Sequence, residues 1–169
     1  ELPRAWVEVG AWLDEQDDGG AVLVPAASFG EYTWGRTIDE PLRGTTRTRY
    51  AVRDAVPLAP AGAIRLLDEL ERRLQTGRSI AGAEEVLRRG GVRYVVLRND
   101  LATTASGQPP VPLARSALRA TPGMTLARGF GVPFVDASGV RVHPVEVYRL
   151  QGLVAGDFTL LEGSDLAVA

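Results

Sequence analysis

The chain has 169 residues, 45% of them hydrophobic, and a formal net charge of -2 at neutral pH. This length fits one compact domain, and a charge so close to zero argues against a nucleic-acid partner, which needs a basic surface. The sequence contains no cysteine, which excludes both a disulfide framework and a thiolate metal site.

The chain also lacks a membrane-spanning signal. No apolar run approaches the ~20 residues that cross a bilayer. The first residues do not form a basic segment followed by an apolar one, which a secretory leader requires. We therefore expect a soluble piece, which could have been cut from a larger protein.

The first predicted elements are a helix and a buried strand. Apolar residues recur at helical spacing from Leu2 to Leu13, and the "DDGG" at 17–20 ends this pattern. The run "AVLVP" at 21–25 is apolar without alternation, which is typical of a strand buried on both faces.

A long irregular segment follows, from Ala26 to Pro60. It lacks sustained periodicity, but it carries Phe29, Tyr32 and Trp34, and long loops in compact domains are commonly functional or disordered. The aromatic residues favour an ordered loop.

The rest of the chain alternates between helical patterns and strand patterns. The patterns predict helices over 63–74, 79–89 and 113–120, strands over 92–100, 124–131 and 140–150, and a polar loop at 101–112. Ser79 is the expected N-cap of the second of these helices, and Asp68–Arg72 and Glu69–Arg73 are expected ion pairs on the first. The last two strands should pair antiparallel.

Together these elements predict an α/β domain over residues 1–152. We expect a small central mixed sheet of about four or five strands, with helices on both faces and a long ordered loop after the first strand. Residues 153–169 are expected to be a linker and the first strand of a following β-rich module, because "FTLLEGSDLAVA" at 158–169 alternates like a strand.

Common catalytic and cofactor motifs do not fit. The turn "PAASFGEY" after the first strand matches neither a dinucleotide-binding nor a P-loop pattern, and the chain has no lysine. The only histidine, His143, lies in a predicted strand, and Ser28 lacks a nucleophile elbow, so a structural histidine is favoured. An EF-hand-like start at Asp14 fails because Pro25 stands where the bidentate glutamate belongs. We expect no cofactor and no metal site.

The candidate contacts with a glycan or another domain are charged and aromatic residues of the long loop, together with the two polar residues at the C-terminal end of the strand at 92–100. They are Tyr32, Trp34, Arg36, Asp39, Glu40, Arg43, Arg53, Asp54, Asn99 and Asp100. Such residues suit sugar binding and the anchoring of a loop equally well.

Two of these groups have an alternative interpretation. Asp39, Glu40 and Asp54 could supply the paired carboxylates of a glycoside hydrolase, although ion pairs that hold the loop are favoured. Asn99 and Asp100 lie where open α/β sheets bind ligands, although an ordinary turn at the end of a strand is favoured there.

Four stretches carry a resemblance to a known family. "VLVPAASFGEYTWGRTIDEPLRG" (22–44), "YAVRDAVPLAP" (50–60), "GVRYVVLRNDL" (91–101) and "VEVYRL" (145–150) resemble, in that order, the extracytoplasmic segment of actinobacterial α-(1→3)-arabinofuranosyltransferases of the AftD type. The first two stretches are the more specific ones, and the likeness covers most of residues 1–162.

The resemblance implies a large membrane enzyme of the GT-C kind. Such an enzyme transfers arabinofuranose from a decaprenyl-phosphate donor to arabinogalactan or lipoarabinomannan of the cell wall. No catalytic residue can be carried over, because the catalytic acid of the family lies between membrane helices that have no counterpart here.

The implied role of this chain is that of a non-catalytic domain outside the membrane. It would position acceptor glycan or brace the catalytic membrane region, with the transmembrane part of the same chain and carbohydrate-binding-like modules as partners. The alternative is a free-standing carbohydrate-binding or scaffold module of the cell envelope, without transferase activity.

Overall fold

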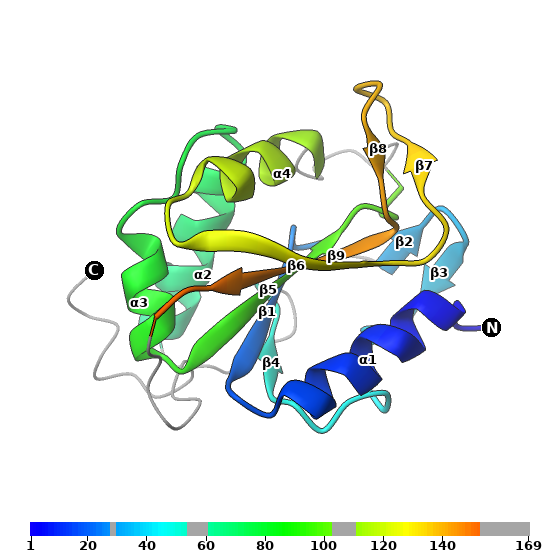
Figure 1. The fold of residues 1–169 in the computed structure, drawn as a ribbon, viewed down its shortest axis with the longest axis horizontal. Coiled ribbons are helices and arrows are strands. Elements are labelled where there is room, and N and C mark those ends of the chain that lie inside the picture. Colours follow the sequence, from blue (N-terminus) through cyan, green and yellow to red (C-terminus); the bar gives the residue numbers. More distant parts are fainter. Residues whose placement is uncertain (28–29, 54–60, 103–110, 153–169) are drawn as a thin grey trace.

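A five-stranded mixed sheet forms the centre of the computed structural model, which describes residues 1–27, 30–53, 61–102 and 111–152 (Figure 1). The strand order is β4-β1-β5-β9-β6. Strands β4, β1 and β5 run parallel, whereas β9 pairs antiparallel with both β5 and β6. The predicted α/β class, the mixed sheet and the antiparallel pairing of the last two long strands are confirmed.

The elements have the following bounds. The helices are α1 (Arg4–Gln16), α2 (Ala61–Leu74), α3 (Ala83–Arg89) and α4 (Val111–Ala120). The central strands are β1 (Gly20–Val24), β4 (Tyr50–Ala51), β5 (Val92–Arg98), β6 (Met124–Phe130) and β9 (Val145–Leu150). Two hairpins lie outside the main sheet: β2 (Gly30–Tyr32) with β3 (Gly35–Thr37), and β7 (Phe134–Val135) with β8 (Arg141–Val142).

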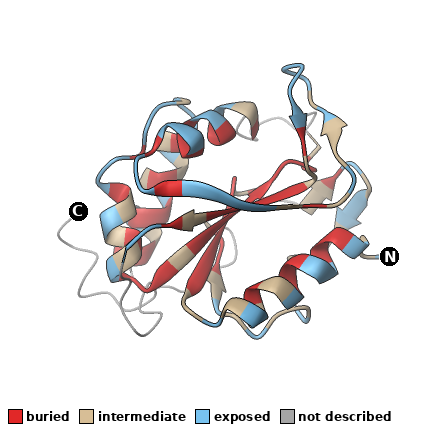
Figure 2. Cartoon of the chain, in the orientation of Figure 1, coloured by how far each residue is buried: buried red, intermediate tan, exposed pale blue. Residues whose placement is uncertain are grey.

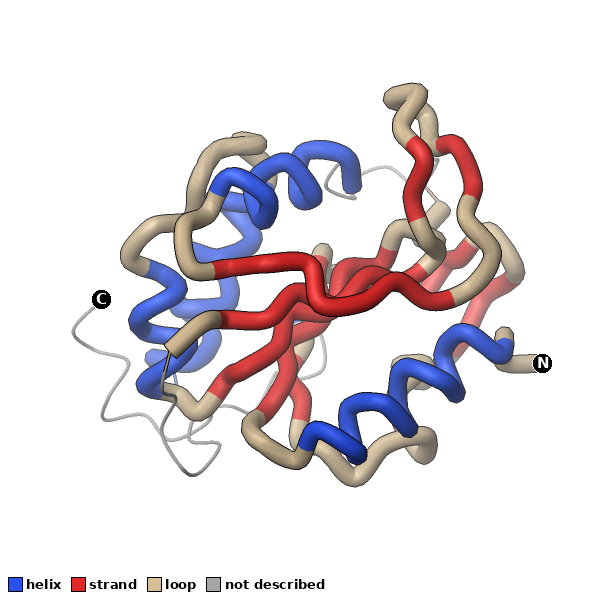
Figure 3. Tube along the Cα trace, viewed as in Figure 1, coloured by secondary structure: helices blue, strands red, loops and turns tan. Residues whose placement is uncertain are grey.

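Helices cover both faces of the sheet, as predicted. Helix α1 lies on one face, while α2, α3 and α4 group on the other (Figures 1 and 3). Trp12 of α1 packs edge-to-face on Tyr94 of β5, with 5.4 Å between the ring centroids, and on Phe130 of β6 at 6.0 Å. Because both faces are covered, β1 is buried along its whole length, and this explains its unbroken apolar sequence.

The core runs through both helix layers. Strands β1, β5 and β9 are buried along nearly their whole length, whereas the middle of the edge strand β6 is exposed. The β7–β8 hairpin is also largely exposed and stands away from the body (Figure 2). None of the helices in the described ranges is long and apolar enough to cross a membrane.

Part of the long segment after β1 is ordered by α1. The Asp14 carboxylate accepts hydrogen bonds from the main-chain N–H groups of Arg47 and Thr48, at 2.8 and 3.0 Å, and from the Thr46 hydroxyl. The Thr46 hydrogen bond contributes most to lowering the pKa of Asp14. Gly10 allows this close approach, since a Cβ at that position would lie 2.4 Å from the Thr45 carbonyl oxygen.

Two local expectations were wrong. Helix α3 begins at Ala83 rather than at Ser79, because the Ser79 hydroxyl accepts a hydrogen bond from the Ala81 N–H in a local turn and Gly82 takes the N-cap position. Asp68 pairs with Arg53 rather than with Arg72, whose guanidinium binds Glu69 instead. The predicted pair between Glu69 and Arg73 is present at 2.5 Å.

Candidate functional site

The β2–β3 hairpin docks at the carboxyl end of β5. Tyr32 forms a β-bridge with Leu101, and the Ala102 N–H donates to the Glu31 carbonyl oxygen at 2.9 Å. The Thr33 N–H donates to the carbonyl oxygen of Asp100 at 2.8 Å. This pairing brings together the aromatic loop and the Asn99–Asp100 pair, two of the regions that the sequence singled out.

Asp100 joins the hairpin to α1. Its Oδ2 accepts hydrogen bonds from the indole N–H of Trp6, at 2.9 Å, and from that of Trp34, at 2.7 Å. Its Oδ1 is buried and has no hydrogen-bond partner within the described part of the chain. Burial raises the pKa of Asp100, although the two indole donors and Arg98 act in the opposite direction. We call Trp6, Trp34 and Asp100 the indole clamp.

The ring of Tyr32 completes this contact. It stacks on Trp34 with 4.7 Å between the ring centroids and meets Trp6 edge-to-face at 5.9 Å. Burial raises the pKa of the Tyr32 phenol above its ordinary value. Tyr32 and Trp34 therefore pack against the body of the domain and hold the hairpin, which is the anchoring interpretation of the aromatic loop.

Arg98 is a fully buried cation beneath the hairpin. Its Nη1 donates to the Tyr32 hydroxyl and to Glu40 Oε2, both at 3.0 Å, and its Nε donates to the Pro25 carbonyl oxygen at 3.1 Å. A buried guanidinium needs a carboxylate and further acceptors to offset the loss of water, and the structure supplies them. Glu40 is therefore an internal ion-pair partner.

The remaining described loop candidates take part in separate ion pairs at or near the surface. Arg36 pairs with Glu31 across the hairpin, and Asp39 pairs with Arg43 at 2.5 Å in an exposed i,i+4 contact. Arg53 contacts Asp68 of α2. Asp54 and Phe29 lie outside the described residues. Asp39 and Glu40 each bind a different arginine, so both carboxylates are engaged in ion pairs, which was the favoured interpretation of these residues.

His143 has a structural environment. Its Nδ1 lies 2.9 Å from the Gly131 carbonyl oxygen, and its ring packs so closely on Gly129 that a Cβ there would come within 2.2 Å of the imidazole. Within the described ranges, no cluster of three or more histidine or acidic side chains could hold a metal ion.

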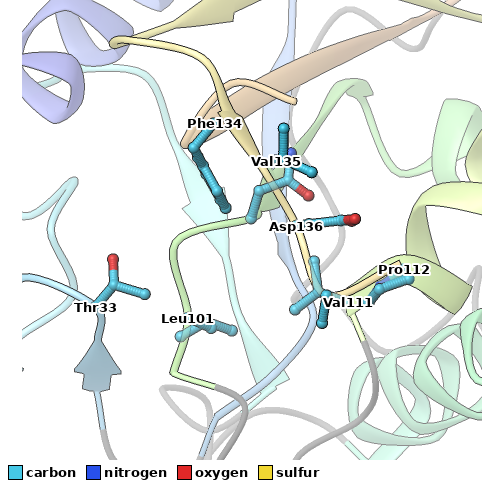
Figure 4. Close-up of a pocket in the computed structure, with 9 residues that line it drawn as sticks. Thr33, Leu101, Val111, Pro112, Phe134, Val135 and Asp136 are labelled. Atoms are coloured by element: carbon cyan, nitrogen blue, oxygen red, sulfur yellow. The ribbon is translucent and has the colours of Figure 1, made fainter. Parts of the chain in front are cut away.

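A pocket of about 150 Å³ lies beside the hairpin, at the carboxyl end of β5 (Figure 4). Four segments line it: Thr33 in the β2–β3 turn, Asn99 and Leu101 after β5, Val111 and Pro112 at the start of α4, and residues 134–137 of the β7–β8 hairpin. In Figure 4, Phe134 and Val135 lie across the opening from Leu101 and Val111. Ligands of open α/β sheets bind at this end of the strands.

An ion pair fixes one wall of the pocket. Asp136 Oδ2 accepts from Arg115 Nη1 at 2.6 Å, and both side chains are almost completely buried. Partial burial disfavours ionisation of Asp136, but hydrogen bonds from Ser138, from the Val140 N–H and from Arg115 prevail and lower its pKa to about 2. The Asp136 carboxylate therefore ties the β7–β8 hairpin to α4.

Asn99 also lines the pocket. Its Nδ2 donates to the His143 carbonyl oxygen at 2.9 Å, which fixes the orientation of the amide. Its Oδ1 is buried and has no hydrogen-bond partner among the described residues.

Sequence reasoning missed much of this site. The contribution of Trp6 carries no local signal, because Trp6 also fits the apolar face of α1. Arg98 does have a local signal in the sequence, because an arginine at the end of a buried strand needs a carboxylate or several other acceptors. The pocket could not be found, because its lining comes from four separate segments of the chain.

Comparisons with known proteins identify the family. Residues 1–163 match the family model of the α-(1→3)-arabinofuranosyltransferase N-terminal GT-C domain. Curated α-(1→3)-arabinofuranosyltransferases from Mycolicibacterium smegmatis and Mycobacterium tuberculosis are 38% and 36% identical over 92% and 88% of this chain. The chain spans only 12% of the length of either relative.

Solved structures give the same answer. The cryo-EM structure of arabinofuranosyltransferase AftD from mycobacteria matches 92% of this chain and 13% of its own, with a TM-score of 0.83 and 31% identity. A mutant of that enzyme matches with a TM-score of 0.81 and 32% identity, covering 92% of this chain and 13% of its own. The match in both sequence and structure confirms the resemblance found in the sequence, and the chain belongs to the α-(1→3)-arabinofuranosyltransferase family.

Proposed function

We propose that this chain is a non-catalytic, extracytoplasmic domain of a membrane arabinofuranosyltransferase. The parent enzyme would use decaprenyl-phosphate arabinose to build cell-wall arabinan. Within it, this domain would hold a rigid polar surface against the membrane-embedded part of the same chain or against the acceptor glycan.

The observation that carries this proposal is the internal use of the candidate reactive groups. Asp100 binds two indole N–H groups, Glu40 binds Arg98, and His143 contacts the Gly131 carbonyl oxygen. Each of these side chains is engaged in holding the hairpin or the strands in place. Such an arrangement suits a positioning role better than chemistry on a substrate, which needs a base or nucleophile within reach of the substrate.

The surface that this framework supports is polar and rigid. Arg36 projects from β3, and Asp39 and Arg43 project from the segment between β3 and β4, together with a fully exposed Ile38. The indole clamp and the Arg98–Glu40 pair connect this region to α1 and β5. An exposed isoleucine among charged side chains on a braced loop is a reasonable contact point for another surface.

The test uses the full-length enzyme that carries this domain. Ile38→Asp and Asp39→Arg change only exposed side chains, so we expect normal expression but several-fold slower transfer of arabinofuranose to an arabinan acceptor. Arg78→Asp is the matched control, because Arg78 is an exposed arginine in the turn after α2, and it should leave transfer unchanged.

Two results would overturn the proposal. One is unchanged transfer by both loop variants at unchanged expression. The other is transfer by the purified 169-residue chain alone, abolished by changing a single acidic residue.

A further inference from the structure

The pocket at the carboxyl end of β5 has room for a single small ring. A cavity of about 150 Å³ accommodates a benzene-sized molecule, whereas drug-sized ligands and cofactors occupy about 300–1,000 Å³. The volume here is about 150 Å³. The pocket therefore suits one monosaccharide residue rather than a nucleotide or a lipid chain.

The charges around the pocket favour a neutral ligand. Its only ionisable lining residue in the described ranges is Asp136, and this carboxylate is neutralised by Arg115. The Arg115 guanidinium also donates to the Ser138 hydroxyl at 3.2 Å, so it is engaged on the protein side. A phosphate group would find no unpaired cation among the described lining residues, although phosphate sites normally use one.

The pocket is lined by both apolar and polar side chains. Leu101, Val111 and Phe134 supply apolar contact, whereas Thr33 and Asn99 are the uncharged polar residues of the lining. Asn99 Oδ1 is the informative atom, because a buried acceptor without a partner calls for an explanation. Rotating the amide by half a turn would not provide a donor, because Oδ1 would then face the His143 carbonyl oxygen, to which Nδ2 now donates.

We propose that this pocket binds one neutral furanose-sized sugar residue of the acceptor glycan. The proposal rests on the proposed function, which it deepens by assigning the acceptor, not the lipid-phosphate donor, to this domain. The less polar face of the ring packs against Phe134 and Leu101. A ring hydroxyl enters the pocket and donates to Asn99 Oδ1, which gains the partner that it lacks.

The test is an NMR titration of the 169-residue chain with methyl α-arabinofuranoside. We expect saturable binding, with shifts concentrated on Thr33, Asn99, Val111 and Phe134. Inorganic phosphate, a probe for the donor headgroup, should leave the same signals unchanged.

A matched pair of variants locates the binding. Val135 lines the pocket and is 64% exposed, so Val135→Trp should obstruct the opening without disturbing the core and weaken sugar binding at least about tenfold. Val132 is 84% exposed and does not line the pocket, so Val132→Trp should bind the sugar as the unmodified chain does.

Equal binding by the two variants, shifts that cluster away from the pocket, or no saturable binding would each overturn the pocket proposal. These results leave the proposed function intact if the loop variants Ile38→Asp and Asp39→Arg still slow transfer in the full-length enzyme. Conversely, sugar binding in the pocket with no effect of the loop variants would leave this inference standing and overturn the proposed role of the loop.

Discussion

At the scale of single residues, Asp100 is the most consequential side chain of the site, because one carboxylate oxygen serves two indole donors from distant parts of the chain. Asp100→Ala leaves both N–H groups without an acceptor, so we expect the free energy of unfolding to fall by about 2–4 kcal/mol. Urea denaturation measures this change. Asp39→Ala, which alters an exposed ion pair, should cost less than about 1 kcal/mol. Equal effects of the two variants would contradict the clamp.

Asp100 should also make the free energy of unfolding depend on pH. Burial raises the pKa of Asp100 in the folded state. The stability that is linked to protonation of Asp100 is therefore full below the ordinary pKa of aspartate, about 3.9, and is lost as the pH rises through the folded value. Asp100→Asn lacks this titration. The difference in unfolding free energy between the unmodified chain and Asp100→Asn should therefore shift in favour of the unmodified chain as the pH falls from neutral to mildly acidic.

At the scale of elements, the β7–β8 hairpin depends on the Arg115–Asp136 pair. An isolated two-stranded hairpin is only marginally stable in water, and this pair ties it to α4. Asp136→Asn leaves Arg115 buried without its carboxylate, so we expect a loss of about 2–4 kcal/mol at neutral pH. Hydrogen-deuterium exchange should show faster exchange in 134–142 than in β5.

The effect of Asp136→Asn on the free energy of unfolding should depend on pH in the opposite sense to that of Asp100→Asn. The pKa of Asp136 is lowered to about 2, so its stabilising contribution is present above the ordinary pKa of aspartate and is lost as the pH falls through about 2. The cost of Asp136→Asn should therefore shrink as the solution is acidified. A cost that stays constant from neutral pH to about pH 2 would show that the ion pair does not hold the hairpin.

The elements that could be predicted are those with a repeating apolar pattern. The face from Trp6 to Leu13 marks α1, and the unbroken apolar runs mark β1 and β5, because burial on a sheet imposes these patterns. Strands β2, β3, β4, β7 and β8 contain only two or three residues each, too few to show a period of two. Their positions depend on partners far away in the sequence, such as Leu101 for Tyr32.

The candidate site was predictable to a similar degree. Aromatic residues in a loop indicated order, and the end of β5 indicated a ligand site, both from local sequence. Which indole binds Asp100, and which segments surround Asn99, follow from the tertiary fold alone. The sequence could therefore name several members of the site without showing how they are joined.

At the scale of the whole molecule, a domain that positions a glycan or a membrane partner must behave as one rigid body. A single contiguous core includes α1 on one face of the sheet, α2, α3 and α4 on the other face, and Tyr32 of the β2–β3 hairpin. Strand β5 is buried in the middle of this core, and each of the other central strands pairs with it or with one of its two neighbours, β1 and β9. We therefore expect the described part of the chain to unfold in one cooperative transition.

Two probes test this expectation from opposite faces of the sheet. Tryptophan fluorescence reports on α1 and the hairpin, where Trp6, Trp12 and Trp34 lie, whereas far-UV circular dichroism also reports on α2, α3 and α4. The two urea curves should coincide. Leu97→Ala removes a fully buried side chain from β5, so it should destabilise the chain by about 2–5 kcal/mol and move both curves together. A fluorescence midpoint at a lower urea concentration than the dichroism midpoint would mean that α1 and the β2–β3 hairpin unfold before the rest of the domain. A surface that unfolds separately from the sheet could not serve as a rigid brace.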